Sequence, residues 1–226
     1  MAGNVFALPW GMRGGVIFDL DGTLVDSRAD LALAVNLTRR DLGLPPLPQD
    51  QVVSFVGEGV RKLLLRALPE HPEWLDRALA LNRSHYRAHL LDQTRLYPGA
   101  LSALEALRAC GWPLMVVTNK PRESTDVILA GLGIQEFMAA VVGGGDCAVL
   151  KPDPAPLLLA LERTGCSPGS SWMAGDNFTD LEAGRRAGMK RCYCRYGFGD
   201  PGDEGWDLAV EGLRELAEHL GAAAAP

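Results

Sequence analysis

The sequence of 226 residues lacks the features that mark membrane-spanning, nucleic-acid-binding or exported proteins. No segment approaches the roughly 20 consecutive apolar residues that a transmembrane helix needs. The formal net charge is −6, whereas binding to a phosphate backbone requires clustered Lys and Arg. The first residues, MAGNVFALPWGMR, contain neither a basic segment nor a sustained apolar one, so no signal peptide is predicted. We therefore expect a soluble cytoplasmic protein that binds neither nucleic acid nor membranes.

Cysteine and histidine patterns that would predict disulfides or a structural metal site are also missing. The five cysteines are irregularly spaced, and Cys192 and Cys194 do not form a Cys-x-x-Cys pair. We interpret all five as reduced, mostly buried thiols. His85 and His89 have i, i+4 spacing without a third ligand nearby, which favours a solvated helix face. The composition of the whole sequence, 47% hydrophobic and 22% charged, is that of a globular protein able to bury a large core.

The first part of the chain predicts one strand followed only by helices. The strand covers about Val16–Asp19. The helix predicted over Ser27–Leu44 begins with a Ser-x-x-Asp capping pattern and ends near a glycine. Two more helices are predicted near 59–68 and 72–91. We therefore predict an all-helical domain at 27–93.

From residue 97 onwards, predicted helices alternate with short buried strands. This alternation predicts a mostly parallel sheet with helices on both faces. The fold class that we expect is α/β, a doubly wound core formed by 1–26 and 94–226. The strands are predicted at 113–119, 139–144, 171–176 and 190–194, and the helices at 98–111, 121–132, 154–165 and 178–188.

Polar residues follow the predicted strands at the points where they end. Because the carboxyl ends of parallel strands meet at one edge of a sheet, we expect these residues to lie together, where ligands bind in such folds. Any one of them has an ordinary structural explanation, since Asp-Gly is a common turn and acids favour a helix N-terminus. Four such coincidences in order are harder to explain structurally. The residues are Asp19, Asp21, Thr118, Asn119, Lys151, Asp176 and Asp180.

Their chemistry suits phosphoryl transfer. Asp19 can attack phosphorus to form an aspartyl-phosphate, and Asp21 can exchange a proton with the leaving group and with water. Paired carboxylates facing a phosphate require a cation, and Mg²⁺ prefers oxygen ligands such as those of Asp176 and Asp180. The ammonium group of Lys151, together with the Thr118 hydroxyl, can hold the phosphate oxygens.

Four motifs in this order resemble those of the haloacid dehalogenase-like hydrolase superfamily. They are FDLDGTLVDS, VVTNK, LKPDPAP and AGDNFTD, and the similarity extends over about residues 15–200. The resemblance implies that Asp19 is the nucleophile and Asp21 the general acid/base. It implies that Asp19, the backbone carbonyl of Asp21 and Asp176 hold Mg²⁺, with support from Asp180. It also implies phosphate binding by the second and third motifs, which contribute Thr118, Asn119 and Lys151.

The predicted helical domain resembles the C1 cap of this superfamily, and three segments resemble phosphoglycolate phosphatases. These are FVGEGVRKLLLRAL, LYPGALSALEALRACGWPLMVVTNKP and KPDPAPLLLALE. In the first, Gly57 lies in a loop that can approach a ligand closely, and Arg61 follows at a helix start. We expect both to bind the carboxylate of 2-phosphoglycolate, although a capped helix with solvated basic residues explains the segment nearly as well. The segment before Pro152 has a single lysine where these phosphatases often have two.

Several alternatives stay open at this point. The substrate could be another small phosphate ester, such as a sugar phosphate or a nucleotide, and a phosphomutase shares the paired aspartates. Halide displacement and phosphonate cleavage are disfavoured because Asp21 is present. A regulatory module that is phosphorylated without turnover would be expected to lack a catalytic acid. Monomer and homodimer are both compatible with the sequence.

Overall fold

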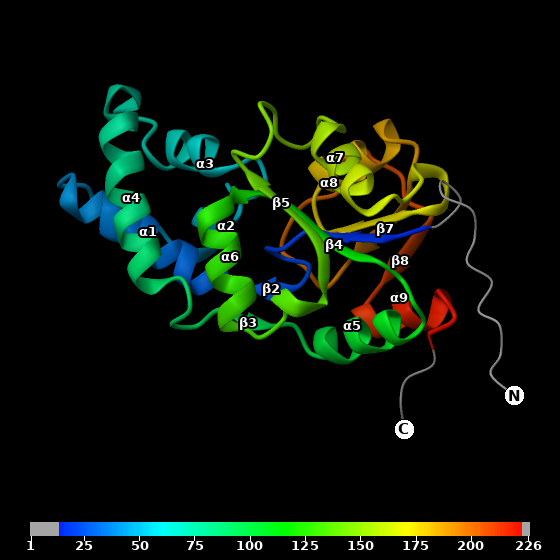
Figure 1. The fold of residues 1–226 in the computed structure, drawn as a ribbon. Coiled ribbons are helices and arrows are strands. Elements are labelled where there is room, and N and C mark those ends of the chain that lie inside the picture. Colours follow the sequence, from blue (N-terminus) through cyan, green and yellow to red (C-terminus); the bar gives the residue numbers. More distant parts are fainter. Residues whose placement is uncertain (1–13, 223–226) are drawn as a thin grey trace, which may run out of the picture.

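A six-stranded sheet forms the centre of the molecule, and every strand pairs in parallel with its neighbours in the order β5-β4-β1-β6-β7-β8. The computed structural model describes residues 14–222 (Figure 1). The short strand β1 lies near the middle of the sheet, and its three side chains are fully buried on alternate faces. The strands are β1 Val16–Phe18, β4 Leu114–Pro121, β5 Met138–Gly144, β6 Trp172–Gly175, β7 Lys190–Cys194 and β8 Leu208–Val210.

Helices cover both faces of this sheet, which confirms the predicted doubly wound α/β core. On one face α5 (Ala100–Ala109), α6 (Arg122–Gly131) and α9 (Leu213–His219) pack in the larger hydrophobic cluster. On the other face α7 (Ala155–Thr164) and α8 (Phe178–Arg186) pack in a second cluster. Short 3-10 helices occur at Gln135–Phe137 and Pro168–Ser170. The strand β8 was not predicted, because only one of its three side chains is buried.

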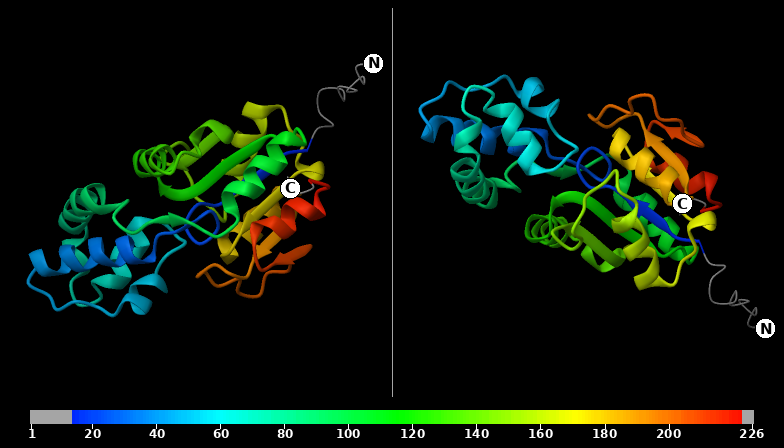
Figure 2. Two further views of the ribbon diagram at one scale, coloured as in Figure 1. Left: turned by 90° about the horizontal axis from the view of Figure 1, so that it is seen from below. Right: turned by 90° about the horizontal axis from the view of Figure 1, so that it is seen from above.

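Four helices form a separate lobe between β1 and β4, which confirms the predicted helical insertion (Figure 2). We call α1–α4 the helical insertion. It has a hydrophobic cluster of its own, and an antiparallel pair of two-residue strands, β2 and β3, stands at its two ends. The limits 27–93 for an independent domain stay a prediction. The elements are β2 Val25–Asp26, α1 Arg28–Asp41, α2 Gln49–Val53, α3 Val60–Ala67, the 3-10 helix Pro72–Trp74, α4 Leu75–His89 and β3 Arg95–Leu96.

The capping pattern predicted at the start of α1 is wrong. Ser27 occupies the N-cap position, but neither it nor Asp30 caps the helix by a side-chain hydrogen bond. The Ser27 hydroxyl instead donates to Asp21. The buried Asp30 carboxylate accepts hydrogen bonds from the backbone N–H groups of Gln93 and Thr94 and from the Thr94 hydroxyl. Partners distant in sequence outcompete the local cap, and they tie α1 to the segment that leaves the insertion.

The remaining expectations concern thiols, histidines and membrane segments. Three cysteines are buried, Cys110 is exposed, and all five are free thiols. His85 contacts Asp41 and His89 contacts Asp92, so each has a carboxylate partner of its own rather than a shared metal. Within residues 14–222, no helix is both long and apolar enough to cross a membrane. The prediction about the N-terminal signal segment concerns residues 1–13, outside the described part.

Candidate active site

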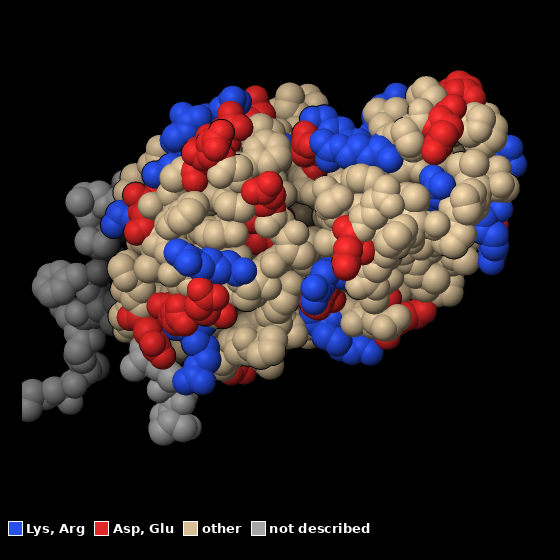
Figure 3. Space-filling model, turned by 180° about the vertical axis from the view of Figure 1, so that it is seen from behind, with Lys and Arg blue, Asp and Glu red and all other residues tan. Residues whose placement is uncertain are grey.

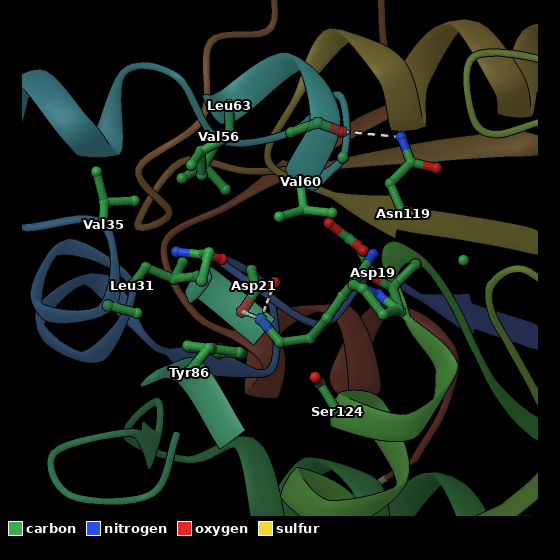
Figure 4. Close-up of a pocket in the computed structure, with 18 of the residues that line it drawn as sticks. Asp19, Asp21, Leu31, Val35, Val56, Val60, Leu63, Tyr86, Asn119 and Ser124 are labelled. Carbon is green, nitrogen blue, oxygen red and sulfur yellow. Dashed lines mark hydrogen bonds and ion pairs between the residues drawn. The ribbon is translucent and has the colours of Figure 1, made fainter. Parts of the chain in front are cut away.

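A cavity of about 440 Å³ lies between the carboxyl-end edge of the sheet and the helical insertion. Its floor includes residues that follow β1, β4 and β6, and its opposite wall comes from α1, α3 and α4 (Figure 4). A hollow between the two lobes is visible on the surface, where acidic and basic side chains are interspersed (Figure 3). The structure brings Asp19, Asp21, Thr118, Asn119 and Asp176 to this cavity, as the sequence predicted.

Lys151 lies beneath the floor of the cavity as the cation of a buried ion-pair network. Its Nζ is 2.9 Å from Oδ1 of Asp19 and 2.6 Å from Oδ1 of Asp180, and it donates to the backbone carbonyl of Val117. Burial alone would lower the pKa of Lys151, but the charges of Asp180 and Asp19 outweigh it and raise this pKa. The ammonium group therefore stays charged beside the candidate nucleophile.

Backbone N–H groups hold both Asp176 and Asp180, from the start of α8 for Asp180 and from the loop after β7 for Asp176. Asp180 Oδ2 accepts a hydrogen bond from the backbone N–H of Asn177, which completes a capping box. Asp176 Oδ2 accepts from the backbone N–H groups of Phe198 and Gly199, at 3.0 and 2.7 Å. Burial, followed by the charges of Asp180 and Asp19, raises the pKa of Asp176 well above its usual value. Burial and the charge of Asp19 raise the pKa of Asp180 to about 7.

These carboxylates fit a divalent cation. One oxygen from each of Asp19, Asp176 and Asp180 lies within 4.8 Å of the others, and all three residues are buried. Lys151 alone does not balance three carboxylates, which is why burial and mutual repulsion raise the pKa of two of them. Gly22 has φ +84°, and a Cβ there would lie 1.9 Å from Asp176 Oδ2, so the chain must be glycine to pass this carboxylate.

The side chain of Asp21 faces a lysine that the sequence analysis did not assign. Lys120 Nζ lies 2.8 and 2.7 Å from the two carboxylate oxygens of Asp21, and the Ser27 hydroxyl donates to Oδ1 at 2.5 Å. Lys120 Nζ also lies 4.7 Å from the ring centroid of Tyr86 on α4. Burial would lower the pKa of Lys120, but the charge and hydrogen bonds of Asp21, together with Tyr86, outweigh burial and raise this pKa. Lys120 is the last residue of the VVTNK motif, and this place in the motif is the sequence signal that could have identified it.

Asn119 and Thr118 play different parts at the end of β4. The Asn119 amide donates to the backbone carbonyls of Gly57 and Lys151, both at 2.9 Å, and accepts from the Lys151 N–H. The Asn119 amide therefore links the Gly57 loop of the insertion to the segment that contains Lys151, and both its oxygen and its nitrogen have hydrogen-bond partners. Thr118 Oγ1 accepts from the Lys120 N–H at 3.2 Å, which leaves its proton to donate toward the cavity.

The structure brings Gly57 to the cavity but leaves Arg61 outside its lining. Gly57 has φ +121°, and a Cβ there would lie 2.6 Å from Nδ2 of Asn177, so glycine is needed for this close approach. The Arg61 side chain is 66% exposed and lies 3.7 Å from Asp76. On the insertion side, the guanidinium that does line the cavity belongs to Arg83, which pairs with Glu123.

The chain belongs to the haloacid dehalogenase-like hydrolases, whose family pattern matches residues 16–194. A phosphoglycolate phosphatase of Chromobacterium violaceum is 38% identical over 208 residues, which cover 89% of this chain and 93% of that protein. One of Aquifex aeolicus is 38% identical over 183 residues, covering 81% and 85%. A crystal structure of a predicted phosphoglycolate phosphatase from Haemophilus somnus has a TM-score of 0.86 at 29% identity, covering 92% and 98%. The chain is therefore an enzyme of the hydrolase class, and these relatives place it among the phosphatases of the family.

Proposed function

We propose that this enzyme hydrolyses 2-phosphoglycolate to glycolate and phosphate, with Mg²⁺, through an aspartyl-phosphate on Asp19. The observation that carries the proposal is the pairing of two aspartates with two different lysines. Asp19 lies beside Lys151, and Asp21 lies between Lys120 and Ser27. One carboxylate is thus placed to attack phosphorus and the other to handle protons. The relatives named phosphoglycolate phosphatase support the choice of substrate.

In the first step, a carboxylate oxygen of Asp19 forms a bond to phosphorus while the bond from phosphorus to the glycolate oxygen breaks. Asp21 gives its proton to that oxygen, so glycolate leaves as the alcohol. Lys151 stays charged and holds Asp19 in place, and the Thr118 hydroxyl donates to a phosphate oxygen. The product of this step is an acyl phosphate on Asp19.

In the second step, a water molecule attacks the phosphorus of the acyl phosphate. Asp21, now a carboxylate, takes a proton from that water, and the bond from Asp19 to phosphorus breaks. The Lys120 ammonium and the Ser27 hydroxyl hold the side chain of Asp21 in position. Inorganic phosphate leaves, and Asp19 and Asp21 return to their starting states.

We propose that Asp19 and Asp176, with the backbone carbonyl of Asp21, hold the Mg²⁺ ion, which neutralises the negative charge developing on the phosphate oxygens. Both carboxylate oxygens of Asp180 already have partners, Lys151 and the Asn177 N–H, so its part is to support this group. Binding of the substrate carboxylate was assigned to Gly57 and Arg61, and the exposed position of Arg61 gives that residue no structural support.

Initial rates across a panel of small phosphate esters test the proposal. The enzyme should show its highest kcat/KM for 2-phosphoglycolate, with release of inorganic phosphate and no transfer of phosphate within the substrate. A sugar phosphate or nucleotide preferred by about tenfold, equivalent to about 1.4 kcal/mol of transition-state stabilisation, would contradict the substrate assignment and leave the hydrolytic mechanism standing.

A further inference from the structure

The wall of the cavity that faces Asp19 consists almost entirely of apolar side chains. They project from the helical insertion toward the catalytic edge, and Figure 4 shows six of them across the cavity from Asp19. These six come from α1, α3, α4 and the loop before α3, and are Leu31, Val35, Val56, Val60, Leu63 and Tyr86. The Ala34 and Leu79 side chains extend the same wall.

Polar groups on this wall are few, and they include the Tyr86 hydroxyl, which is buried without a hydrogen-bond partner. Among the described residues of the insertion, Arg83 is the charged one that lines the cavity, and it pairs with Glu123. The Asn82 amide donates to the Thr38 hydroxyl. A polar leaving group would therefore lose water on entering this half of the cavity and meet few hydrogen-bonding groups there, which disfavours its binding.

The cavity is also larger than a two-carbon acid requires. Its volume of about 440 Å³ falls in the roughly 300–1,000 Å³ range in which pockets enclose ligands of drug size. The proposed phosphate and metal sites take up only the floor, where Asp19, Asp176 and Thr118 lie. The space beneath the apolar wall lies where the leaving group of a phosphate ester must point, since phosphorus has to face Asp19.

We propose that the enzyme has a further activity, the hydrolysis of phosphate monoesters whose leaving group is an apolar alkyl alcohol. This rests on the proposed phosphate-ester hydrolysis at Asp19. The Asp19 oxygen bonds to phosphorus, the ester bond breaks, and Asp21 protonates the departing oxygen, which leaves as the alcohol. Water then hydrolyses the acyl phosphate. In the first step the hydrocarbon portion packs against the side chains of α1, α3 and α4.

The size of the effect follows from hydrophobic transfer. Each methylene that packs against the wall should raise kcat/KM about fourfold, corresponding to roughly 0.8 kcal/mol per buried CH₂. The experiment compares methyl, propyl and hexyl phosphates, and 2-phosphoglycolate, on the full-length enzyme with Mg²⁺. Inhibition by methyl- and hexylphosphonate, which cannot be hydrolysed, measures binding separately from turnover. We expect hexylphosphonate to inhibit at a much lower concentration.

Two substitutions of the same chemistry locate the effect. Leu31→Gln makes the apolar wall polar with a side chain of similar length. Leu65→Gln makes the same change on α3 at a residue that is 37% exposed and absent from the cavity lining. Leu31→Gln should reduce the hexyl-to-methyl ratio of kcat/KM several-fold, and Leu65→Gln should leave it unchanged. Because each ratio comes from one preparation, a smaller folded fraction cannot alter it.

The outcomes separate this inference from the choice of 2-phosphoglycolate. A rising alkyl series that is flattened by Leu31→Gln supports the inference, whether or not 2-phosphoglycolate is hydrolysed. A flat or falling series on an enzyme that hydrolyses 2-phosphoglycolate overturns the inference alone. An enzyme that hydrolyses none of these esters overturns both. Equal effects of Leu31→Gln and Leu65→Gln would show that the wall does not contact the leaving group, and would also overturn it.

Discussion

Replacing Lys120 by Met should separate the proton-transfer step from the attack on phosphorus. In the structure the Lys120 ammonium contacts both carboxylate oxygens of Asp21, at 2.7 and 2.8 Å, and the Ser27 hydroxyl is the other side-chain donor to Asp21 that the structure gives. Methionine removes the charge and both contacts while keeping a similar length. General acid catalysis contributes about 10²–10⁴ in rate, so losing the alignment of Asp21 should reduce kcat for 2-phosphoglycolate about 10- to 100-fold.

Comparing two substrates whose leaving groups differ in their need for a proton tests this role of Lys120. p-Nitrophenolate departs without a proton, so Lys120→Met should slow p-nitrophenyl phosphate hydrolysis much less than that of 2-phosphoglycolate. Breaking a buried ion pair costs about 3–5 kcal/mol of folding stability, so rates must be normalised to folded enzyme. Lys120→Arg, which keeps the charge, should retain more of the activity. An equal loss of kcat on both substrates, or an additive effect in the double variant with Asp21→Asn, would refute the role.

Three further predictions concern the carboxylates of Asp19, Asp176 and Asp180. Excess EDTA should abolish turnover and Mg²⁺ should restore it, as followed by phosphate release; full activity in chelator would exclude the metal site. Asp19→Asn should lose activity and the beryllium fluoride adduct that wild type forms, as detected by mass spectrometry; substantial residual activity would exclude the covalent route. The pKa values of Asp176 and Asp180 are raised in the folded protein, so the stability they contribute is complete below their unfolded pKa near 4 and is lost as pH rises, for Asp180 through its folded pKa of about 7. The metal-free melting temperature should therefore be lower at pH 8 than at pH 5, Mg²⁺ should raise it more at pH 8, and Asp180→Asn should reduce the difference; a metal-free protein more stable at pH 8 would contradict the sign.

The catalytic edge could be predicted because its signals are local. Each buried strand ends in a polar residue within a few positions, and the rule that parallel strands align their carboxyl ends places those residues together. Asp19, Thr118 and Asp176 therefore meet at the cavity although 99 and 58 positions separate successive members. The order of helices and strands needed only hydrophobic periodicity. The strand β8 could not be predicted, because it has three residues and one buried side chain, too few to show an alternating hydrophobic pattern.

We expected Arg61 to bind the substrate, but its side chain lies outside the cavity lining. The hydrophobic pattern of the same helix indicates this outward position. Val60, Leu63, Leu64 and Ala67 recur at the spacing of one helix face, and they line the cavity or the core of the insertion. Neighbouring residues on a helix with 3.6 residues per turn point about 100° apart. Arg61, directly after Val60, therefore turns to solvent. The position of Arg61 is therefore predicted better by the helical periodicity of α3 than by the charge of Arg61 and the nearby glycines.

The contacts that sequence could not reveal are those between the insertion and the catalytic edge. Ser27 at the start of α1 donates to Asp21, Tyr86 on α4 covers Lys120, and the loop carbonyl of Gly57 accepts from Asn119. In each of these contacts the two residues meet only because the whole chain packs as it does, and no local sequence pattern pairs them. Because the proposed acid/base and its lysine are both held partly by the insertion, the wall proposed to contact the leaving group is linked through these contacts to the residue proposed to protonate it. A substitution that displaces α4 should consequently change kcat as well as KM, which a wall used only for binding would not do.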